Sequence, residues 1–338
     1  MSLTEADKAI RATGIGASEA WKIVLGHGAH DVFLRLVHPE LLVPGDDDAG
    51  LPARKGNALE PVVAELFAER YGLRPEQLEA CGTLRHPEHP FVLATPDRLV
   101  LTEDLKGIDE LLEIKCPTIN TRDEWGPDLD TAPDAFPLKY RIQATLQMDL
   151  TKARKASLAA LIEGEGNIRV YPVPWDEELA GLIVEQLVRF WRDHVLTKEP
   201  PAPDSSEAAA NFLRKKYPKN VGTYRAPTGD AIHLVETGEV LDGDAALARE
   251  LARVNAQMRE LKQRKALLTH VAMGRTGEAD GVEGLWNWKL PKTGKGRVAW
   301  KSAALEGRVP AEIIAKHTAP AQRKFRLLND EDDDNEET

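Results

Sequence analysis

The chain is poor in cysteine, which limits the kinds of site it can build. Only Cys81 and Cys116 occur among its 338 residues. Two thiols cannot form a disulfide framework, a four-thiolate metal site or an iron–sulfur cluster. Free thiols are the usual state in a reducing compartment, so we expect a cytoplasmic protein.

Long apolar runs are also missing. No stretch approaches the roughly 18–20 apolar residues that a membrane-spanning helix requires. The N-terminal stretch MSLTEADKAIRATG lacks the apolar segment of a secretion signal. The sequence therefore predicts a protein that neither crosses a membrane nor is exported.

The chain has no excess of positive charge. Its formal net charge is −11, which argues against a protein with a broadly basic surface for binding nucleic acid. Seven of the acidic side chains fall in the last nine residues, 330–338. Self-repulsion predicts a disordered tail there, serving either solubility or the screening of nucleic acid.

What the sequence does contain is the composition and pattern of a globular protein. It is 42% hydrophobic and 29% charged, enough to build a core. Residues 1–200 alternate helical and strand patterns, which predicts an α/β fold with a mixed sheet flanked by helices. Within it we expect a polar loop at GDDDAGLPARKGN, a helix opened by Pro61, and two strands in TLRHPEHPFVLATPDRLVL.

The stretch KEPPAPDSS is rich in proline and serine and marks the best boundary. We expect a core over 1–200 and a C-terminal extension over 201–329, followed by the acidic tail. The extension should form a helical arm over 242–273 and a small cap containing strands. Large apolar residues lie near one stripe of that helix: Leu247, Leu251, Val254, Met258, Leu261, Leu268 and Val271.

The most informative stretch is LLEIKCP, residues 111–117. Side chains alternate along a strand, so Glu113 and Lys115 share one face, and Leu112 and Ile114 share the other. Opposite charges on an inner strand are costly unless they serve each other or a third charge. Asp97 ends the preceding apolar run FVLA, and a hairpin-like connection would place it beside Glu113.

Two carboxylates brought together repel each other, and a divalent cation removes the repulsion. Carboxylate oxygens and water are the ligands that Mg²⁺ or Mn²⁺ prefers. Asp97 and Glu113 thus predict a metal site for phosphodiester hydrolysis, with Lys115 orienting or deprotonating the attacking water. The alternative is a buried ion pair that caps the edge of a sheet.

Two further segments carry polar residues suited to such a site. Glu60 stands just before Pro61, where it would either cap a helix or supply another carboxylate. In KYRIQATLQMDL, Gln143 and Gln147 lie four residues apart on one face of a helix. They would hold water or phosphate, or else form a polar stripe at the sheet edge.

Taken together, these residues resemble the lambda exonuclease and YqaJ-like viral recombinase family, within the PD-(D/E)xK nuclease superfamily. Four blocks match in order over residues 11–150: RATGIGASEA, GNALEP, ATPDRLVL with LLEIKCPTINTRDEW, and YRIQATLQM. The chain departs from lambda-type enzymes in its length, most of the surplus lying beyond residue 205. Whether the ring-shaped trimer of that family transfers is therefore left open.

The resemblance implies roles for particular residues. Metal ligation would involve Asp97, Glu113, the Ile114 carbonyl and Glu60, with Lys115 and Gln143 acting on the nucleophilic water. The 5′-phosphate of DNA would be bound by Arg11 and Ser18, with Arg122 contacting another phosphate. A guanidinium binds a terminal phosphate bidentately, and the Gly-rich turn adds N–H donors.

The resemblance also implies a function and partners. The first hypothesis is a Mg²⁺-dependent 5′-to-3′ exonuclease, bacterial or phage-encoded, that acts on double-stranded DNA ends and supplies a single-strand annealing protein. The second is an endonuclease of the same superfamily from a restriction or defence system. The third is a catalytically silent DNA-end-binding adaptor. We expect the histidine pairs HGAH and HPEHP, Cys116 and the tryptophans to play structural rather than catalytic roles.

Overall fold

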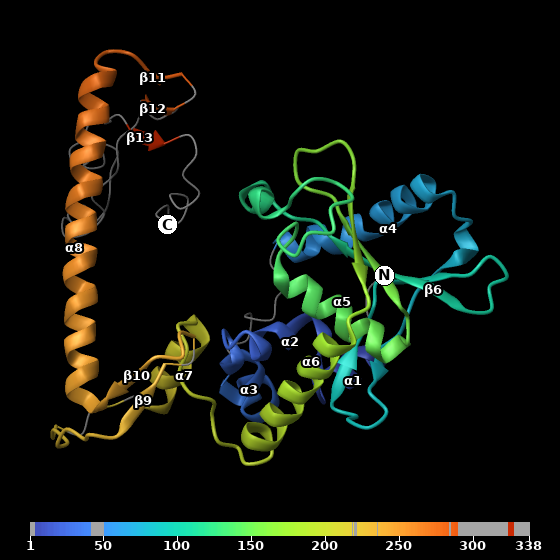
Figure 1. Cartoon of the computed structure of the whole chain (residues 1–338), viewed down its shortest axis with the longest axis horizontal. Coiled ribbons are helices and arrows are strands. Elements are labelled where there is room, and N and C mark those ends of the chain that lie inside the picture. Colours follow the sequence, from blue (N-terminus) through green and yellow to red (C-terminus); the bar gives the residue numbers. More distant parts are fainter. Residues whose placement is uncertain are drawn as a thin grey trace, which may run out of the picture. The chain divides into compact units, whose positions relative to one another are not determined.

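The computed structural model describes residues 4–41, 51–217, 219, 222–234, 236–283, 285–289 and 324–327. The chain divides into two compact units (Figure 1). The first comprises Met1–Pro227 and Ala231–Leu241, and the second comprises Thr228–Asp230 and Asp242–Thr338. Among the described residues, no helix is both long and apolar enough to cross a membrane.

A five-stranded mixed sheet forms the centre of the first unit. Its order is β2-β5-β6-β7-β8, and only the central pair β6–β7 is parallel. The strands are β2 (Leu78–Glu79), β5 (Arg98–Leu101), β6 (Ile108–Lys115), β7 (Lys155–Ala160) and β8 (Arg169–Pro174). The parallel connection from β6 to β7 carries helix α5 (Leu138–Thr151), as such pairs require a long crossover.

Helices cover both faces of this sheet. Helix α4 (Leu51–Tyr71) packs Val63 and Phe67 against Leu112 and Ile114 of β6. Helix α5 packs Ala144 and Met148 against the other face, beside Leu111 and Leu158. Because side chains alternate along β6, Leu112 and Ile114 face α4, whereas Leu111 faces α5. The predicted α/β fold, a mixed sheet flanked by helices, is confirmed.

A smaller sheet extends the first unit on the far side of α5. Its order is β1-β4-β3, with β1 (Ile15–Gly16), β4 (Val92–Ala94) and β3 (Leu84–Arg85). Gly14 precedes β1 so closely to the backbone of Phe91 that a Cβ there would lie 2.2 Å from the Phe91 oxygen. The glycines of RATGIGASEA are thus partly explained by packing. Around this sheet lie α1 (Glu5–Arg11), α2 (Ala17–Val24), α3 (Ala29–Val37), α6 (Glu177–Phe190) and the π-helical turn η4 (Trp191–Val195).

Two expected elements differ from the structure. Helix α4 begins at Leu51 rather than at Pro61, so the segment 51–57 is helical and Glu60 is inside a helix, not at its N-terminus. Good helix formers in LPARKGNALE extend the helix backwards, and Pro52 fits its first turn. The segment TLRHPEHPFVLATPDRLVL forms three strands rather than two, because Pro96 interrupts the second run before β5.

The first unit also extends beyond the boundary expected at residue 200. Helix α7 (Glu207–Lys216) is capped by Ser206 and buries Ala209 and Phe212. Phe212 packs edge-on against Phe33 of α3, with ring centroids 6.0 Å apart. The KEPPAPDSS segment is thus a connection inside a compact unit. The hairpin of β9 (Ala231–His233) and β10 (Val240–Asp242) follows α7.

The second unit begins with the predicted long helix, α8 (Gly243–Thr276). A three-stranded antiparallel sheet follows, with β11 (Gly281–Val282), β12 (Trp286–Lys289) and β13 (Lys324–Leu327). The Trp286 indole N–H donates to Thr276 Oγ1 at 2.9 Å, which ties this sheet to the end of α8. Residues 290–323 of the expected cap and the acidic tail lie outside the described residues.

Candidate active site

The charged pair of strand β6 lies on the face covered by α5. Glu113 is buried, and its Oε1 accepts a hydrogen bond from Lys115 Nζ at 2.6 Å. On the opposite face, Leu112 and Ile114 pack against α4. The pairing predicted from strand alternation is confirmed, and the packing of the two apolar residues anchors the strand that carries it.

Helix α5 supplies two more partners for the same carboxylate. The amide Nε2 of Gln143 donates to Glu113 Oε1, and that of Gln147 donates to Glu113 Oε2 at 2.7 Å. Both glutamines are buried, and they lie one turn apart. Each oxygen of Glu113 is therefore fixed by at least one donor, so the orientation of the carboxylate is set by the helix rather than by solvent.

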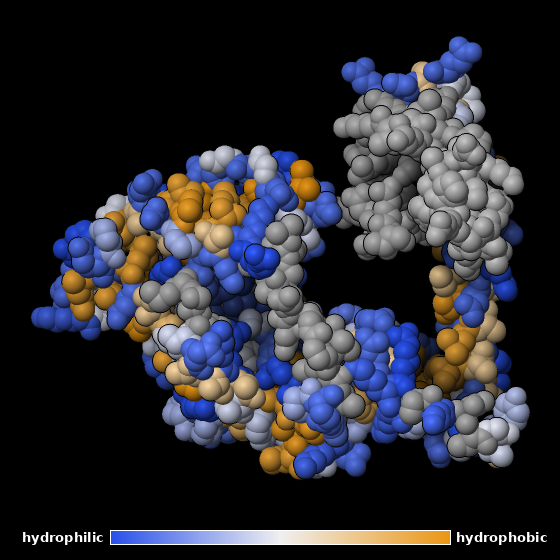
Figure 2. Space-filling view, turned by 180° about the vertical axis from the view of Figure 1, so that it is seen from behind, coloured by the Kyte–Doolittle hydropathy of each residue, from blue (hydrophilic) through white to orange (hydrophobic). Residues whose placement is uncertain are grey.

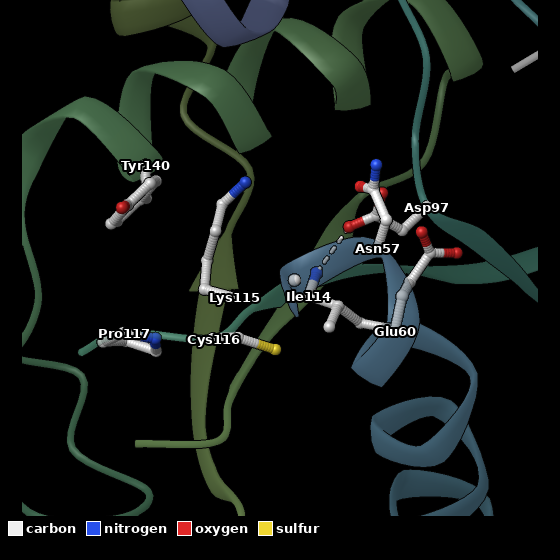
Figure 3. A pocket seen from close by; sticks show the side chains of 9 residues that line it. Asn57, Glu60, Asp97, Ile114, Lys115, Cys116, Pro117 and Tyr140 are labelled. Atoms are coloured by element: carbon white, nitrogen blue, oxygen red, sulfur yellow. Dashed lines mark hydrogen bonds between the residues drawn. The ribbon is translucent and has the colours of Figure 1, made fainter. Parts of the chain in front are cut away.

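Asp97 joins this pair from the turn that enters β5. Arg98 is paired with Leu112 in the antiparallel ladder, so Asp97 lies beside the end of β6. Its Oδ2 accepts from the Ile114 backbone N–H at 2.7 Å (Figure 3). Burial, followed by repulsion from Glu113, raises the pKa of Asp97 to about 7, although Lys115 and the Ile114 N–H oppose the rise.

Lys115 is held between the carboxylates and an aromatic ring. Burial alone would lower the pKa of Lys115, but the attraction of Glu113 and Asp97 outweighs it and the pKa is raised. Its Nζ also lies 5.0 Å from the centre of the Tyr140 ring. In this arrangement Lys115 is an ammonium, suited to donating hydrogen bonds to water or phosphate oxygens.

Glu60 reaches the same region from the middle of α4. Its Oε1 lies 2.6 Å from Arg98 Nη1, and both side chains are largely buried. Arg98 also donates to the backbone oxygen of Asp97. The carboxylate of Glu60 is thus neutralised by the guanidinium of Arg98. In contrast, Asp97 accepts from a backbone N–H, and Glu113 accepts from two amides and one ammonium.

Three of these side chains, Glu60, Asp97 and Lys115, line a cavity of about 450 Å³, whereas Glu113 and Gln143 are not part of its lining. In Figure 3, Asp97, Asn57 and Glu60 lie together on one side, with Lys115 and Tyr140 towards the other. The full lining comprises Gly56, Asn57, Glu60, Asp97, Ile114, Lys115, Cys116, Pro117 and Tyr140. Cys116 borders the cavity, and burial raises the pKa of its thiol, so it remains protonated.

Sequence reasoning missed Asn57 and Tyr140. Both stand three residues before a residue that it did select, Glu60 and Gln143 respectively. Residues three apart on a helix lie on neighbouring positions of one face. Helical spacing from the selected residues was therefore the available signal, but for Asn57 it required knowing that α4 begins at Leu51.

The donor set suits a hard divalent cation. Asp97 and Glu113 present carboxylate oxygens next to Ile114, and their repulsion is the kind that such a cation relieves. In the part of the chain that the structure describes, no group of three or more His, Cys, Asp or Glu side chains is arranged to hold a metal ion. A cation here would therefore depend on two carboxylates, supplemented by backbone oxygen and water, unless Arg98 releases Glu60.

The predicted phosphate-binding residues lie near each other. Arg11 ends α1 and Ser18 lies in the first turn of α2, and Arg11 Nη2 donates to Ser18 Oγ at 3.4 Å. Arg35 of α3 donates to the backbone oxygen of Gly14 at 2.8 Å and pairs with Glu19. Arg35 thus stabilises the turn between α1 and α2. The hydrogen bond between Arg11 and Ser18 is one that a phosphate can replace.

The remaining basic candidate, Arg122, lies in the short 3-10 helix η3 (Ile119–Glu124) that follows β6. Its side chain is 53% exposed, and its Nε lies 3.4 Å from Glu165 Oε1. The structure thus places Arg122 at the surface, with an acidic neighbour within salt-bridge distance. Exposed ion pairs of this kind are weak, so the guanidinium remains accessible to a polyanion.

The histidine pairs have structural partners. His27 contacts Glu236 at 2.8 Å, and His86 contacts Asp149 at 3.4 Å and stacks on His89. His30 is buried against Phe212, and burial lowers the pKa of its ring. Both pairs thus contact other parts of the first unit, and their structural rather than catalytic role stays a prediction.

Known proteins resemble part of this chain. The family model for the YqaJ-like viral recombinase domain matches residues 8–154. The uncharacterized protein YqaJ of Bacillus subtilis (strain 168) is 32% identical over 211 residues, which make up 61% of this chain and 61% of that protein. The aligned part therefore spans less than two thirds of that relative.

Solved structures also align, at low identity. An alkaline exonuclease from Laribacter hongkongensis is 20% identical, covers 63% of this chain and 97% of its own, and has a TM-score of 0.47. A phage-related exonuclease from Haemophilus somnus 129PT is 17% identical, covers 55% and 96%, and has a TM-score of 0.37. The match of the family model includes Asp97, Glu113, Lys115 and Gln143 as well as Arg11. Residues 8–154 of the chain therefore match the YqaJ-like viral recombinase domain, the family that the four ordered sequence blocks resemble.

Proposed function

We propose that the chain is a Mg²⁺-dependent deoxyribonuclease that digests linear double-stranded DNA from the 5′ end. The observation that carries the proposal is the convergence of Asp97, Glu113 and Lys115 at one end of β5 and β6, inside a viral recombinase domain. A protein that only binds DNA gains nothing from clustered carboxylates, because they repel phosphate. The same cluster is what hydrolysis of a phosphodiester needs.

The chain's own residues would divide the work as follows. Asp97, Glu113 and the Ile114 carbonyl hold the cation, with Glu60 as a further carboxylate when Arg98 releases it. Mg²⁺ held there, or Mn²⁺ in its place, would supply an activated water and neutralise phosphate charge. Lys115 orients that water by donating a hydrogen bond, and Gln143 positions it from α5. Gln147 keeps Glu113 in place.

The direction of digestion rests on the turn between α1 and α2. Arg11 and Ser18 lie 3.4 Å apart there, and a guanidinium beside a hydroxyl is suited to a terminal phosphate. Arg122 would contact a phosphate further along the duplex. Removal of one strand from the 5′ end leaves a 3′ overhang, the substrate of a single-strand annealing protein in the cytoplasm of a bacterium.

A comparison of linear and circular DNA tests the proposal. With Mg²⁺, the protein should degrade 5′-phosphorylated linear duplex and leave closed circular plasmid intact, and Asp97→Ala should abolish the activity. Arg11→Ala should slow digestion of phosphorylated ends, whereas Lys8→Ala, an exposed change on the same helix, should not. Equal cutting of the circle would instead favour an endonuclease.

Retention of activity by Asp97→Ala would refute the site assignment, and absence of any cleavage with retained binding of DNA ends would favour the adaptor. Purified wild-type protein with both Mg²⁺ and Mn²⁺ is needed for that last comparison, since one ion alone does not separate a silent site from a poorly filled one.

A further inference from the structure

Helix α8 carries a regular apolar seam. Its large apolar residues are spaced alternately four and three apart: Leu247, Leu251, Val254, Met258 and Leu261. Lys265, Leu268 and Ala272 continue the same spacing. This is the heptad repeat of a coiled coil, whose 3.5-residue period keeps one seam facing a partner helix along its whole length.

The seam is open to solvent. Leu251, Val254, Met258, Leu261 and Leu268 are each between 40% and 63% exposed. Figure 2 shows apolar residues at the surface of α8. Contiguous apolar exposure of this kind marks an interaction surface, and a helix gains most of its stability by packing such a face.

We propose that two copies of the chain associate through α8 as an antiparallel coiled coil. A second copy presents the same seam with the same period, which a compact globular surface does not. In the antiparallel arrangement that brings Met258 opposite Leu261 of the other copy, every seam position finds a partner. Leu251 then faces Leu268, Val254 faces Lys265, and Leu247 faces Ala272.

Charge decides between the two possible directions. In a parallel pair Lys265 would face Lys265 of the other copy inside the seam, where like charges are costly. In the antiparallel pair it faces Val254, along which its aliphatic stem can pack. The residues flanking the seam agree, because Glu250 and Arg264 occupy equivalent flanking positions of opposite charge that approach each other across an antiparallel pair.

The oligomeric state of the full-length protein tests the proposal. Sedimentation velocity at micromolar concentrations should give a dimer for the wild type. The double change Leu251→Glu with Leu268→Glu should raise the dissociation constant by more than about 100-fold, because it buries four carboxylates in the seam. The matched control Ala256→Glu with Gln263→Glu, on the outer face of the same helix, should leave the dimer intact. Circular dichroism should show the fold unchanged in all variants.

Cysteine pairs test the direction. Oxidation of the variant with both Leu251→Cys and Leu268→Cys should give a covalent dimer, and neither change alone should do so. A wild-type monomer would overturn the proposal. A dimer that survives both glutamates, or crosslinking by Leu251→Cys alone, would overturn it too. Since none of these readouts requires nuclease activity, failure here is distinct from failure of the proposed function.

Discussion

Asp97 occupies a position where its negative charge is unfavourable without a cation. Its pKa is raised from 3.8 to about 7 by burial and by Glu113. The unfolded chain therefore ionises first, and the unfolding free energy of the metal-free protein falls as pH rises from about 4 to about 7. Above about pH 7 the unfolding free energy stays at this lower value. The stability of the metal-free fold therefore gives no reason for an aspartate at this position.

Replacement of Asp97 by asparagine should therefore stabilise the metal-free protein. Asparagine keeps an oxygen that accepts from the Ile114 N–H but carries no charge. In EDTA near pH 8 we expect Asp97→Asn to raise the unfolding free energy by about 1–3 kcal/mol, allowing for partial solvent screening. Near pH 4 the variant and wild type should be equal. Urea unfolding measures both, and equal stability near pH 8 would contradict the electrostatic argument.

Asp128 provides a control of opposite sign. Burial alone would raise its pKa, but hydrogen bonds from Arg70 and from the Val170 N–H lower it. Its ionised form therefore stabilises the fold at neutral pH, and that stability is lost as pH falls through its lowered pKa. Asp128→Asn should destabilise the protein near pH 8, in the same urea experiment in which Asp97→Asn stabilises it.

Gln147 holds Glu113 without lining the cavity. Gln147→Leu would leave Glu113 Oε2 buried without this donor, so we expect stability to fall by about 1–3 kcal/mol. Activity, or apparent Mg²⁺ affinity, should fall about 10- to 100-fold because a ligand's supporting hydrogen bond is lost. Nuclease rates over a Mg²⁺ titration measure the effect. The exposed change Leu138→Ala on the same helix should leave the Mg²⁺ dependence unaltered.

At the scale of elements, strand β6 could be predicted from the sequence, whereas the start of helix α4 could not. The alternation in LLEIKCP places Glu113 and Lys115 correctly, because period two is the same wherever the strand lies. The predicted start of α4 was wrong because proline is usually found in the first turn of a helix, and the prediction placed Pro61 there. Asn57 and the Arg98–Glu60 pair could not be found without that helix in place, since they depend on its packing over β5.

Pro61 lies inside α4, directly after Glu60 and one turn after Asn57, and both of these residues line the cavity. It cannot donate to the carbonyl of Asn57, the bond that a regular helix makes at this position. Pro61→Ala should restore that bond and stabilise the protein by about 1–3 kcal/mol. It should also reduce activity, because the turn that carries Glu60 tightens. Thermal unfolding and nuclease rates test both parts. Pro52→Ala, in the first turn, should change neither.

At the scale of the whole molecule, the sequence predicted an α/β core followed by an extension with a long helix. It did not predict the residue at which the first unit ends. Composition placed the break at KEPPAPDSS, since proline and serine usually mark linkers. The burial of Phe212 in the first core instead makes α7 part of the first unit. Only the tertiary contacts of α7 reveal this. The apolar stripe of α8 was visible in the sequence, whereas its exposure was not.

Under the proposed function, binding of Mg²⁺ would link the local electrostatics to the stability of the whole protein. A ligand that binds only the folded state stabilises it, by about 2.7 kcal/mol at a hundred times its dissociation constant. The stabilisation by Mg²⁺ should grow as pH rises through about 7, because the cation and the proton compete for Asp97. Differential scanning fluorimetry with and without Mg²⁺ across this range tests it. Asp97→Asn should lose most of the shift, and a pH-independent shift in the wild type would place the cation elsewhere.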